Sequence, residues 1–252
     1  MADEKQTLVG GLRAVELWFR PVREISSGNV TFYQSQTRLN TPDLGTLMPE
    51  NFRDVSEITS QCVSLFKLEL VQALETHNKL KEREVSFNWL SVYMPVAFLK
   101  EDMAEKKLQE YFLKFEVPTN RICFALSEKL LEESDGVAAG VIGRLRNKGF
   151  HFMITGFGGN SCPMMRLSMF PVDYVMLSPE VANYIGNDER SDNAVKSIVG
   201  FVSDMGAEAI ADGVINSRQA ETLFGFECHY CTGNLVGKYV QDRYIRRRSD
   251  EE

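Results

Sequence analysis

Residues 14–36 read AVELWFRPVREISSGNVTFYQSQ, and this stretch decides the class of fold. Two apolar runs of strand length, 14–22 and 30–36, are separated only by residues 23–29. A parallel crossover needs a dozen residues or more, so these two runs are predicted to form an antiparallel pair of strands.

Strand candidates in the remainder of the chain alternate with stretches of helical period, which is the pattern of a parallel sheet covered by helices. Further strands are predicted at 85–94, 122–126, 150–154, 174–177, 208–211 and 230–236. Helices are predicted at 52–80, 99–115, 137–147, 163–169, 193–205 and 217–224. Eight strands with helices between most of them predict an α/β fold, a TIM-like (β/α)8 barrel with one antiparallel strand. In such barrels, functional groups are expected at the carboxyl ends of the strands.

Length and charge favour one domain with few anionic partners. Residues 1–252 are predicted to form a single domain with its core at about 12–240, a short acidic N-terminus and an arginine-rich, then acidic, C-terminal tail. The formal net charge of −7 argues against a nucleic-acid or anionic-membrane partner, because both need clustered positive charge. In the tail, arginines at 243 and 246–248 precede acidic residues at 250–252. A solvated chain end is expected there, and a polyanion contact is the alternative.

The cysteines indicate a reducing compartment. There are five, an odd number scattered along the chain, so a cytoplasmic protein with free thiols is expected. No apolar run approaches the ~18 residues of a membrane span, and no membrane partner is predicted. Cys228 and Cys231 form a Cys-x-x-Cys pair that is predicted to be two buried small apolar residues. Half of a zinc site or a redox pair is the alternative.

Short motifs along the chain follow the order and spacing of a known family. They lie at 19–22, 28–38, 47–52, 90–95, 126–128, 153–160, 173–178, 211–214 and 232–234. Through these motifs, over roughly residues 12–240, the chain resembles the EAL domain, a family of bacterial phosphodiesterases and sensors of cyclic di-GMP. The signature Glu-Ala-Leu triplet reads Gln34-Ser35-Gln36 here, while Arg38 is kept.

The departures from the family pattern fall on its metal ligands. The resemblance implies that ligand positions of the family here hold Gln34, Tyr93, Ala125, Thr155 and Gly156. Thr155 and Gly156 belong to the stretch 153–160, MITGFGGN, which keeps its glycines but has lost the paired aspartates of the family.

Three further family positions carry Asp212 for a glutamate, Met176 for the lysine that positions the attacking water, and Thr232 for the closing glutamine. A divalent cation needs several hard oxygen ligands, and Asp212 is the one carboxylate among the substituted positions. The chain is therefore expected to hold no metal or cofactor, to have no catalytic residue and to be no enzyme. No hydrolysis of a phosphodiester is expected with magnesium or manganese.

Nucleotide binding is a separate question from catalysis. The candidate ligand-binding residues are Arg38, whose guanidinium can pair with a phosphate, and Glu128, Asp212, Gly158 and Gly159. For Arg38 the alternative is a structural role, with its stem packed on the barrel rim and its charge paired with a carboxylate. Bulky or apolar side chains at Tyr93 and Met176 disfavour cyclic di-GMP as a ligand.

These residues predict a catalytically inactive EAL-like regulatory protein of bacterial signalling that acts through protein–protein contacts. A homodimer is left open, and the protein partner is unknown. The first alternative is a receptor for cyclic di-GMP, and the next is a phosphodiesterase. A different chemistry with Glu128 and Asp212 as an acid/base pair is the last.

Overall fold

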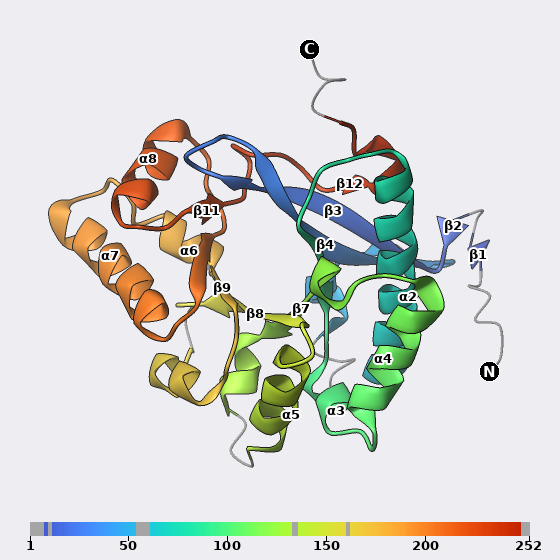
Figure 1. Ribbon diagram of the computed structural model, residues 1–252. Coiled ribbons are helices and arrows are strands. Elements are labelled where there is room, and N and C mark those ends of the chain that lie inside the picture. The colour runs from blue at the N-terminus through green and yellow to red at the C-terminus, as the bar shows by residue number, and fades with distance from the viewer. Residues whose placement is uncertain (1–7, 10–11, 54–60, 133–135, 160–161, 248–252) are drawn as a thin grey trace.

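Eight strands close into a ring in the computed structural model, which describes residues 8–9, 12–53, 61–132, 136–159 and 162–247 (Figure 1). Around the ring the order is β3 (Val15–Glu24), β11 (Tyr230–Cys231), β10 (Glu208–Ala211), β9 (Tyr174–Leu177), β8 (His151–Phe157), β7 (Ile122–Ser127), β6 (Trp89–Tyr93) and β4 (Val30–Thr41). The strand β3 is antiparallel to both of its neighbours, β11 and β4. The other neighbours in the ring are parallel. The predicted barrel with one antiparallel strand is therefore confirmed.

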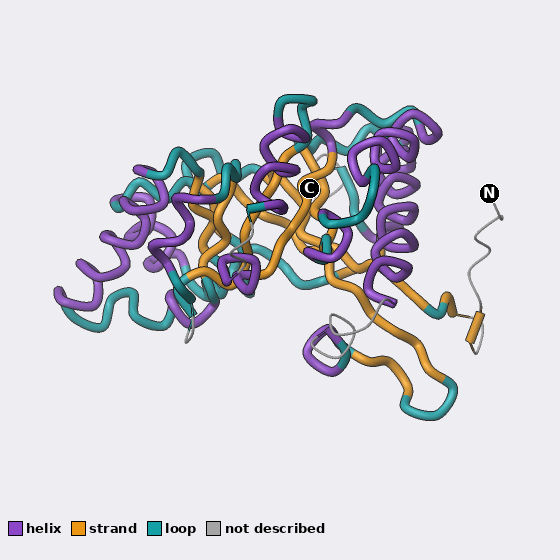
Figure 2. The backbone as a smooth tube through the Cα atoms, turned by 90° about the horizontal axis from the view of Figure 1, so that it is seen from below, coloured by secondary structure: helices purple, strands orange, loops and turns teal. Residues whose placement is uncertain are grey.

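The antiparallel pair extends further than the sequence predicts. Strand β4 continues past residue 36 to Thr41 and turns into β5 (Gly45–Leu47), with which it forms a hairpin. Figure 2 shows this hairpin reaching away from the barrel. Its inner part stays paired with β3 up to the partners Val15 and Leu39. Strands β3 and β4 thus stay paired with each other beyond the ring of eight strands. The sequence therefore has no turn signal at the point where β4 leaves the barrel.

Two strand ends differ from their predicted bounds for backbone reasons. Strand β8 does not stop at residue 154 but runs to Phe157 through an irregularity of register, and Gly156 lies in the left-handed region at φ +79°. Such a bulge bends a strand without ending it. Strand β11 ends at Cys231 and not at 236, because the next residues turn through Gly233 at φ +136°.

Helices cover the outside of the barrel (Figure 1). They are α2 (Gln61–Glu82), α3 (Val96–Leu99), α4 (Ala104–Phe115), α5 (Val137–Arg146), α6 (Pro179–Ala182), α7 (Glu189–Asp204) and α8 (Ser217–Gly225). The 3-10 helices are η1 (Pro49–Asn51), η2 (Thr119–Arg121), η3 (Glu128–Glu132), η4 (Met164–Met169) and η5 (Asp242–Tyr244). Short strands outside the ring are β1 (Leu8–Val9), β2 (Leu12–Arg13) and β12 (Val240–Gln241). None of the helices in these described ranges combines the length and the hydropathy that a membrane span requires.

Local chemistry explains where the helices differ from prediction. The part of the predicted helix 52–80 at 54–60 lies outside the described residues. The predicted helix 99–115 begins only at Ala104, because Met103 before it is left-handed at φ +59°, and the separate short helix α3 already ends at Leu99. The helix α7 begins four residues before 193, since the Asp188 carboxylate caps it by accepting from the Ser191 amide at 2.7 Å. The segment 163–169 is 3-10 and not α-helical.

Alternate residues of the strands face two different apolar cores. One lies between sheet and helices and contains Phe66, Phe124 and Phe152, all fully buried. The other fills the barrel interior and consists of Val22, Phe32, Trp89, Cys123, Ala125, Met153, Met176 and Ile210. Phe32 and Trp89 stack with ring centroids 4.1 Å apart. The barrel is therefore plugged from inside, and a ligand can enter only above this plug.

The Cys228 and Cys231 side chains are buried and free, so the prediction of two small apolar core residues is confirmed. Burial raises the pKa of the Cys228 thiol to about 12 and that of Cys231 to about 11. Both thiols therefore stay protonated at neutral pH, which is the unreactive form of cysteine.

One buried histidine predicts a dependence of stability on pH. His77 on α2 is 2% exposed, its Nδ1 lies 3.0 Å from Asn78 Oδ1, and Arg121 Nε lies 3.4 Å from its Nε2. Burial lowers the pKa of His77 below 6.5, the hydrogen bond with Asn78 opposes this, and the charges of Arg121 and Lys81 add to the lowering.

Because the unfolded chain takes up a proton at His77 before the folded chain does, the free energy of unfolding should decrease as the pH falls below 6.5. Replacement of His77 by glutamine should flatten this dependence between pH 7 and 5 in urea unfolding. The matched control is glutamine at the exposed His229, which should leave the dependence as it is. Equal slopes for the wild type and the His77→Gln variant would contradict the assignment.

Candidate functional site

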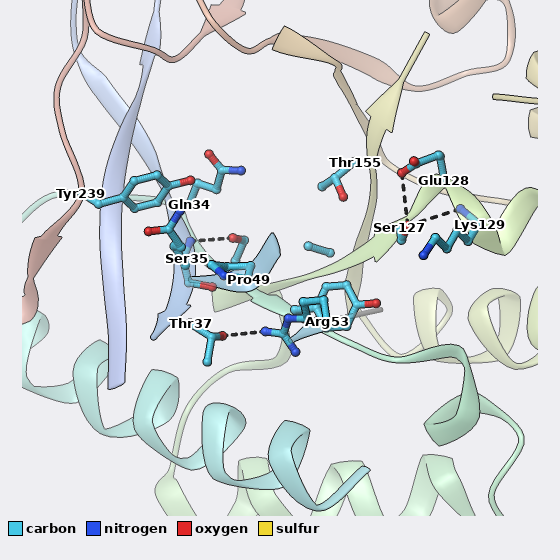
Figure 3. Close-up of a pocket in the computed structure, with 14 residues that line it drawn as sticks. Gln34, Ser35, Thr37, Pro49, Arg53, Ser127, Glu128, Lys129, Thr155 and Tyr239 are labelled. Atoms are coloured by element: carbon cyan, nitrogen blue, oxygen red, sulfur yellow. Dashed lines mark hydrogen bonds between the residues drawn. The ribbon is translucent and has the colours of Figure 1, made fainter. Parts of the chain in front are cut away.

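A cavity of about 330 Å3 opens at the carboxyl ends of the parallel strands (Figure 3). It is called the strand-end pocket below, and its lining surface is polar and apolar in about equal parts. The lining residues are Gln34, Ser35, Gln36, Thr37, Pro49, Arg53, Ser91, Tyr93, Ala125, Ser127, Glu128, Lys129, Thr155 and Tyr239. Hydroxyl and amide groups dominate, and the charged members are Arg53, Lys129 and Glu128. Such a lining can offer many hydrogen bonds to a polar or anionic ligand.

One side of the pocket is fixed by Arg20 from β3. Its guanidinium donates to Gln34 Oε1 and, at 2.8 Å, to Asp212 Oδ1. The Arg20 and Asp212 side chains are only 14% and 12% exposed, and Arg20 also lies 4.8 Å from the centre of the Tyr239 ring. The carboxylate of Asp212 is therefore already neutralised by an ion pair. This ion pair links β3, which carries Arg20, to Asp212 directly after β10, next to the pocket wall.

A second, buried ion pair joins Arg53, which lines the pocket, to Glu69. Arg53 Nη2 lies 2.6 Å from Glu69 Oε1, and both groups also hydrogen-bond to Thr37 Oγ1 at 2.6 Å. The Arg53 guanidinium lies 4.1 Å from the centre of the Tyr93 ring. Burial raises the pKa of Glu69, which is fully buried, while the Arg53 charge and the Thr37 hydrogen bond lower it. Figure 3 shows Arg53 and Thr37 together below the pocket.

Arg53 and Glu69 were not among the residues that the sequence singled out. A signal for Glu69 exists in the sequence, because it lies three and four residues from apolar positions that line the buried face of α2, such as Phe66 and Ala73. A charged residue on a buried face needs a partner. The sequence does not show that Arg53 is that partner, since 16 residues separate the two.

The structure brings four of the five substituted family positions together in the lining, namely Gln34, Tyr93, Ala125 and Thr155. The fifth, Gly156, directly follows Thr155. A Cβ added at Gly156 would lie 2.5 Å from Glu128 Oε2. The Glu128 carboxylate also accepts from Ser127 Oγ at 3.1 Å. Glu128 thus fills the space that a side chain at 156 would need.

The candidate ligand-binding residues fall into two groups. Glu128 lies in the pocket lining, whereas Arg38, Asp212, Gly158 and Gly159 do not. An added Cβ at Gly158 would meet Val181 of α6 at 3.1 Å, so this turn packs against a helix. The ligand-binding roles of these residues stay predictions.

Arg38 lies on the same face of β4 as Gln34 and Gln36, because alternate residues of a strand share a face. Its guanidinium stacks on the Trp18 ring with Cζ 3.4 Å from the centroid. Burial lowers the pKa of Arg38, and the nearby Glu16 and Tyr239 oppose this. Two buried polar atoms on this face have no hydrogen-bond partner in the described part of the chain, Gln36 Oε1 and Arg38 Nε.

The donor set at the strand ends does not fit the divalent cations that the family resemblance implies. The carboxylates there are Glu128 and Asp212, and Asp212 is held by Arg20. Within the ranges that the structure describes, no three His, Cys, Asp or Glu side chains lie close enough to share an ion. Magnesium and manganese prefer several carboxylate or carbonyl oxygens. No chemical step through a metal is therefore derived from these residues.

Comparisons with known proteins give one consistent family. The sequence profile described as the EAL domain matches residues 6–239. The chain is 23% identical over 230 residues to the cyclic di-GMP phosphodiesterase RocR of Pseudomonas aeruginosa, which covers 91% of this chain and 58% of RocR. It is 21% identical to the cyclic di-GMP phosphodiesterase PdeL of Escherichia coli, over 88% of this chain and 62% of PdeL. It thus spans about three fifths of the length of these two relatives.

Solved structures have the same fold. The EAL enzyme Bd1971, in a form with cAMP and cyclic di-GMP bound, matches with a TM-score of 0.82 at 20% identity, covering 91% of this chain and 63% of that one. The EAL domain of FimX from Pseudomonas aeruginosa, bound to cyclic di-GMP, matches with a TM-score of 0.78 at 16% identity, covering 90% and 91%.

These findings correct one expectation from the sequence. The expectation that this chain is no enzyme is wrong, because RocR and PdeL, similar over most of this chain, are both named as phosphodiesterases. The expectation rested on the substituted side chains at the strand ends. Those substitutions change which groups the pocket offers to a ligand. The chain is nevertheless similar over most of its length to relatives that are named as enzymes.

Proposed function

This chain belongs to the EAL domain family, and on that premise we propose that it acts in cyclic di-GMP signalling by binding cyclic di-GMP in the strand-end pocket. The relatives RocR and PdeL are named for cyclic di-GMP, and the strand-end pocket is the cavity at the carboxyl ends of the strands in this chain. It rests most on unmet hydrogen-bonding capacity beside the pocket.

That capacity lies on one face of β4. Gln36 Oε1, an acceptor, and Arg38 Nε, a donor, are both buried and have no partner among the described residues. A buried polar atom without a partner is destabilising by about 1–3 kcal/mol, so a ligand that satisfies both atoms gains affinity. Guanine offers N–H donors to the amide oxygen, and a phosphodiester offers acceptors to the guanidinium.

Aromatic rings and charge support the same class of ligand. Tyr93 and Tyr239 both contribute to the lining, and flat rings can stack on purine bases. Lys129, which is exposed and belongs to the lining, adds a positive charge that can attract a phosphate. The Glu69 carboxylate below the floor is paired with Arg53, so it does not repel an anion strongly.

Isothermal titration with cyclic di-GMP tests the proposal, with and without magnesium or manganese. We expect heat of binding for the wild type and at least a tenfold loss of affinity for Arg38→Ala, because a hydrogen bond to a charged group contributes about 1.5–3 kcal/mol. The control is Arg190→Ala, which removes an exposed arginine on α7 and should change the affinity less than twofold. Thermal unfolding of both variants verifies that they are folded.

The same samples are then separated by chromatography to look for hydrolysis. Turnover would place the chain with its phosphodiesterase relatives, and binding without turnover would make it a receptor. Absence of both heat and turnover in all conditions would overturn cyclic di-GMP as the ligand.

Regulation through protein contacts is a second candidate, and one observation favours it. Met165 and Met169 on η4 are 76% and 49% exposed, and η4 packs against η3, which carries Glu128 and Lys129 of the pocket. Methionine-rich surface adapts well to protein partners. Sedimentation over a range of concentrations, with Met165→Glu as the variant, tests for self-association through this surface. A chain that stays monomeric throughout and retains no partner from its native cell would argue against this role.

A further inference from the structure

A second cavity, of about 490 Å3, lies where the C-terminal segment packs against the end of α2. Its lining consists of Arg83, Val85, Arg243, Ile245, Arg246 and Arg247. Four of these six residues are arginines, in a chain whose formal net charge is −7. We call this cavity the arginine pocket. Such a local excess of like charge is destabilising unless an anion compensates it.

The arginine pocket has a fixed frame. The Arg83 guanidinium donates to the backbone oxygens of Asp242 at 2.7 Å and Ile245 at 3.1 Å, and so ties the C-terminal segment to α2. In return, Arg247 Nε donates to the backbone oxygen of Arg83. The side chains of Val85 and Ile245 are 7% and 5% exposed and form an apolar base. The pocket is therefore built from two segments about 160 residues apart that hold each other in place.

Few carboxylates neutralise these arginines. Arg247 pairs with Glu84, and the nearby Asp242 carboxylate is taken by Lys79 at 3.0 Å. The hydrogen bonds of Arg83 go to backbone oxygens. Arg243 and Arg246 are exposed, and neither has an ion pair with a carboxylate in the part of the chain that the structure describes. Three of the four positive charges thus have no carboxylate partner among those residues.

A purely structural role accounts for only part of this arrangement. Cations near the carboxyl end of a helix stabilise it, and Arg83, which also donates to the Lys79 oxygen at 3.3 Å, does this for α2. The side chains of Arg243 and Arg246 donate no hydrogen bond to the end of α2 in the described ranges, although the Arg243 backbone oxygen accepts one from Arg83 at 3.4 Å. Arg243 instead lies 4.9 Å from the centre of the Tyr244 ring. These two side chains are available to bind a ligand.

We infer that the arginine pocket binds a small, multiply charged phosphate anion. The planar guanidinium group matches phosphate oxygens in a two-point geometry, and several such groups around one cavity favour several negative charges close together. Four arginines line this one cavity in a chain whose formal net charge is −7. A cluster of this size favours a compact anion over an extended nucleic acid or a membrane surface, which both need a broad basic surface. This site lies outside the strand-end pocket, and the two linings share no residue.

Titration of the full chain with inorganic tripolyphosphate at constant ionic strength tests this inference. The full chain is used, so that the acidic residues at 250–252 are present in the sample. We expect the double variant Arg243→Ala/Arg246→Ala to lose at least tenfold in affinity, and both side chains are exposed, so the fold should persist. The matched control is Arg190→Ala/Arg218→Ala, which removes the same charge from exposed sites elsewhere and should change affinity less than twofold.

Three results would overturn the inference. The first is that the wild type takes up no tripolyphosphate at low millimolar concentration. The second is an equal loss of affinity in the control variant, because the attraction would then come from diffuse charge. The third is tighter binding of a single-stranded oligonucleotide or of phosphatidylserine vesicles than of tripolyphosphate, which would identify a macromolecular surface. A rise of melting temperature with tripolyphosphate, lost in the double variant, is a second readout that supports it.

Discussion

Replacement of Arg53 by leucine should destabilise the chain by about 3–5 kcal/mol, because it leaves the fully buried Glu69 carboxylate without its cation. For a chain of this size, that corresponds to a decrease of roughly 6–20 °C in melting temperature. The control is Arg144→Leu, which breaks the exposed pair between Arg144 and Glu105 and should be destabilising by less than about 1 kcal/mol. Urea unfolding of both variants at pH 7 measures the difference.

The same pair predicts the direction of a pH effect. Burial raises the folded-state pKa of Glu69 above its ordinary value of 4.5, and the Arg53 charge opposes this rise. Without Arg53 the raised pKa rises further. Between the unfolded and folded pKa values, the unfolded chain has released a proton that the folded chain keeps, so stability falls as the pH increases from 4.5.

The deficit of the Arg53→Leu variant should therefore be larger at pH 8 than at pH 5. A deficit that is small at both values, or that grows toward acid pH, would contradict a paired, charged Glu69. A double variant, Arg53→Leu with Glu69→Leu, should recover part of the loss, because no charge is then left buried.

Gly233→Ala should destabilise the chain by about 4 kcal/mol, through backbone strain and overlap together. Gly233 has φ +136°, and an added Cβ would overlap Val214 O and lie 2.5 Å from Val214 N. The Val214 amide donates to the Thr232 oxygen at 3.0 Å, so the two loops touch through their backbones and neither can withdraw. Thermal unfolding measures the loss.

The control for this glycine is Gly200→Ala in α7, where an added Cβ would meet nothing within 4 Å. That change should stabilise the chain by about 0.5–1 kcal/mol, because alanine is the better helix former. If both glycine variants had the same stability, the overlap at Gly233 would not be real.

Both predictions concern contacts that the sequence does not reveal, although it reveals much of the fold. The sequence predicts the antiparallel first pair and six further strands in barrel order. Its errors of extent include β4 and β11, where tertiary hydrogen bonds set the ends. The sequence also singles out four substituted family positions, Gln34, Tyr93, Ala125 and Thr155, and the structure brings these four into one pocket lining. It was wrong in expecting no enzyme, since the count of carboxylates at strand ends does not decide family function.

What the sequence determined by itself is therefore the order and the kind of the strands. Apolar periodicity and the length of the connections are local properties, and they suffice to decide whether neighbouring strands are parallel. The tertiary structure alone decided which partners the charged groups meet: Arg53 with Glu69, Arg20 with Asp212, and Arg83 with the backbone oxygens of Asp242 and Ile245. These partners lie between 16 and 192 residues apart. Local spacing carries no information on such contacts, because they form only when packing brings distant segments together.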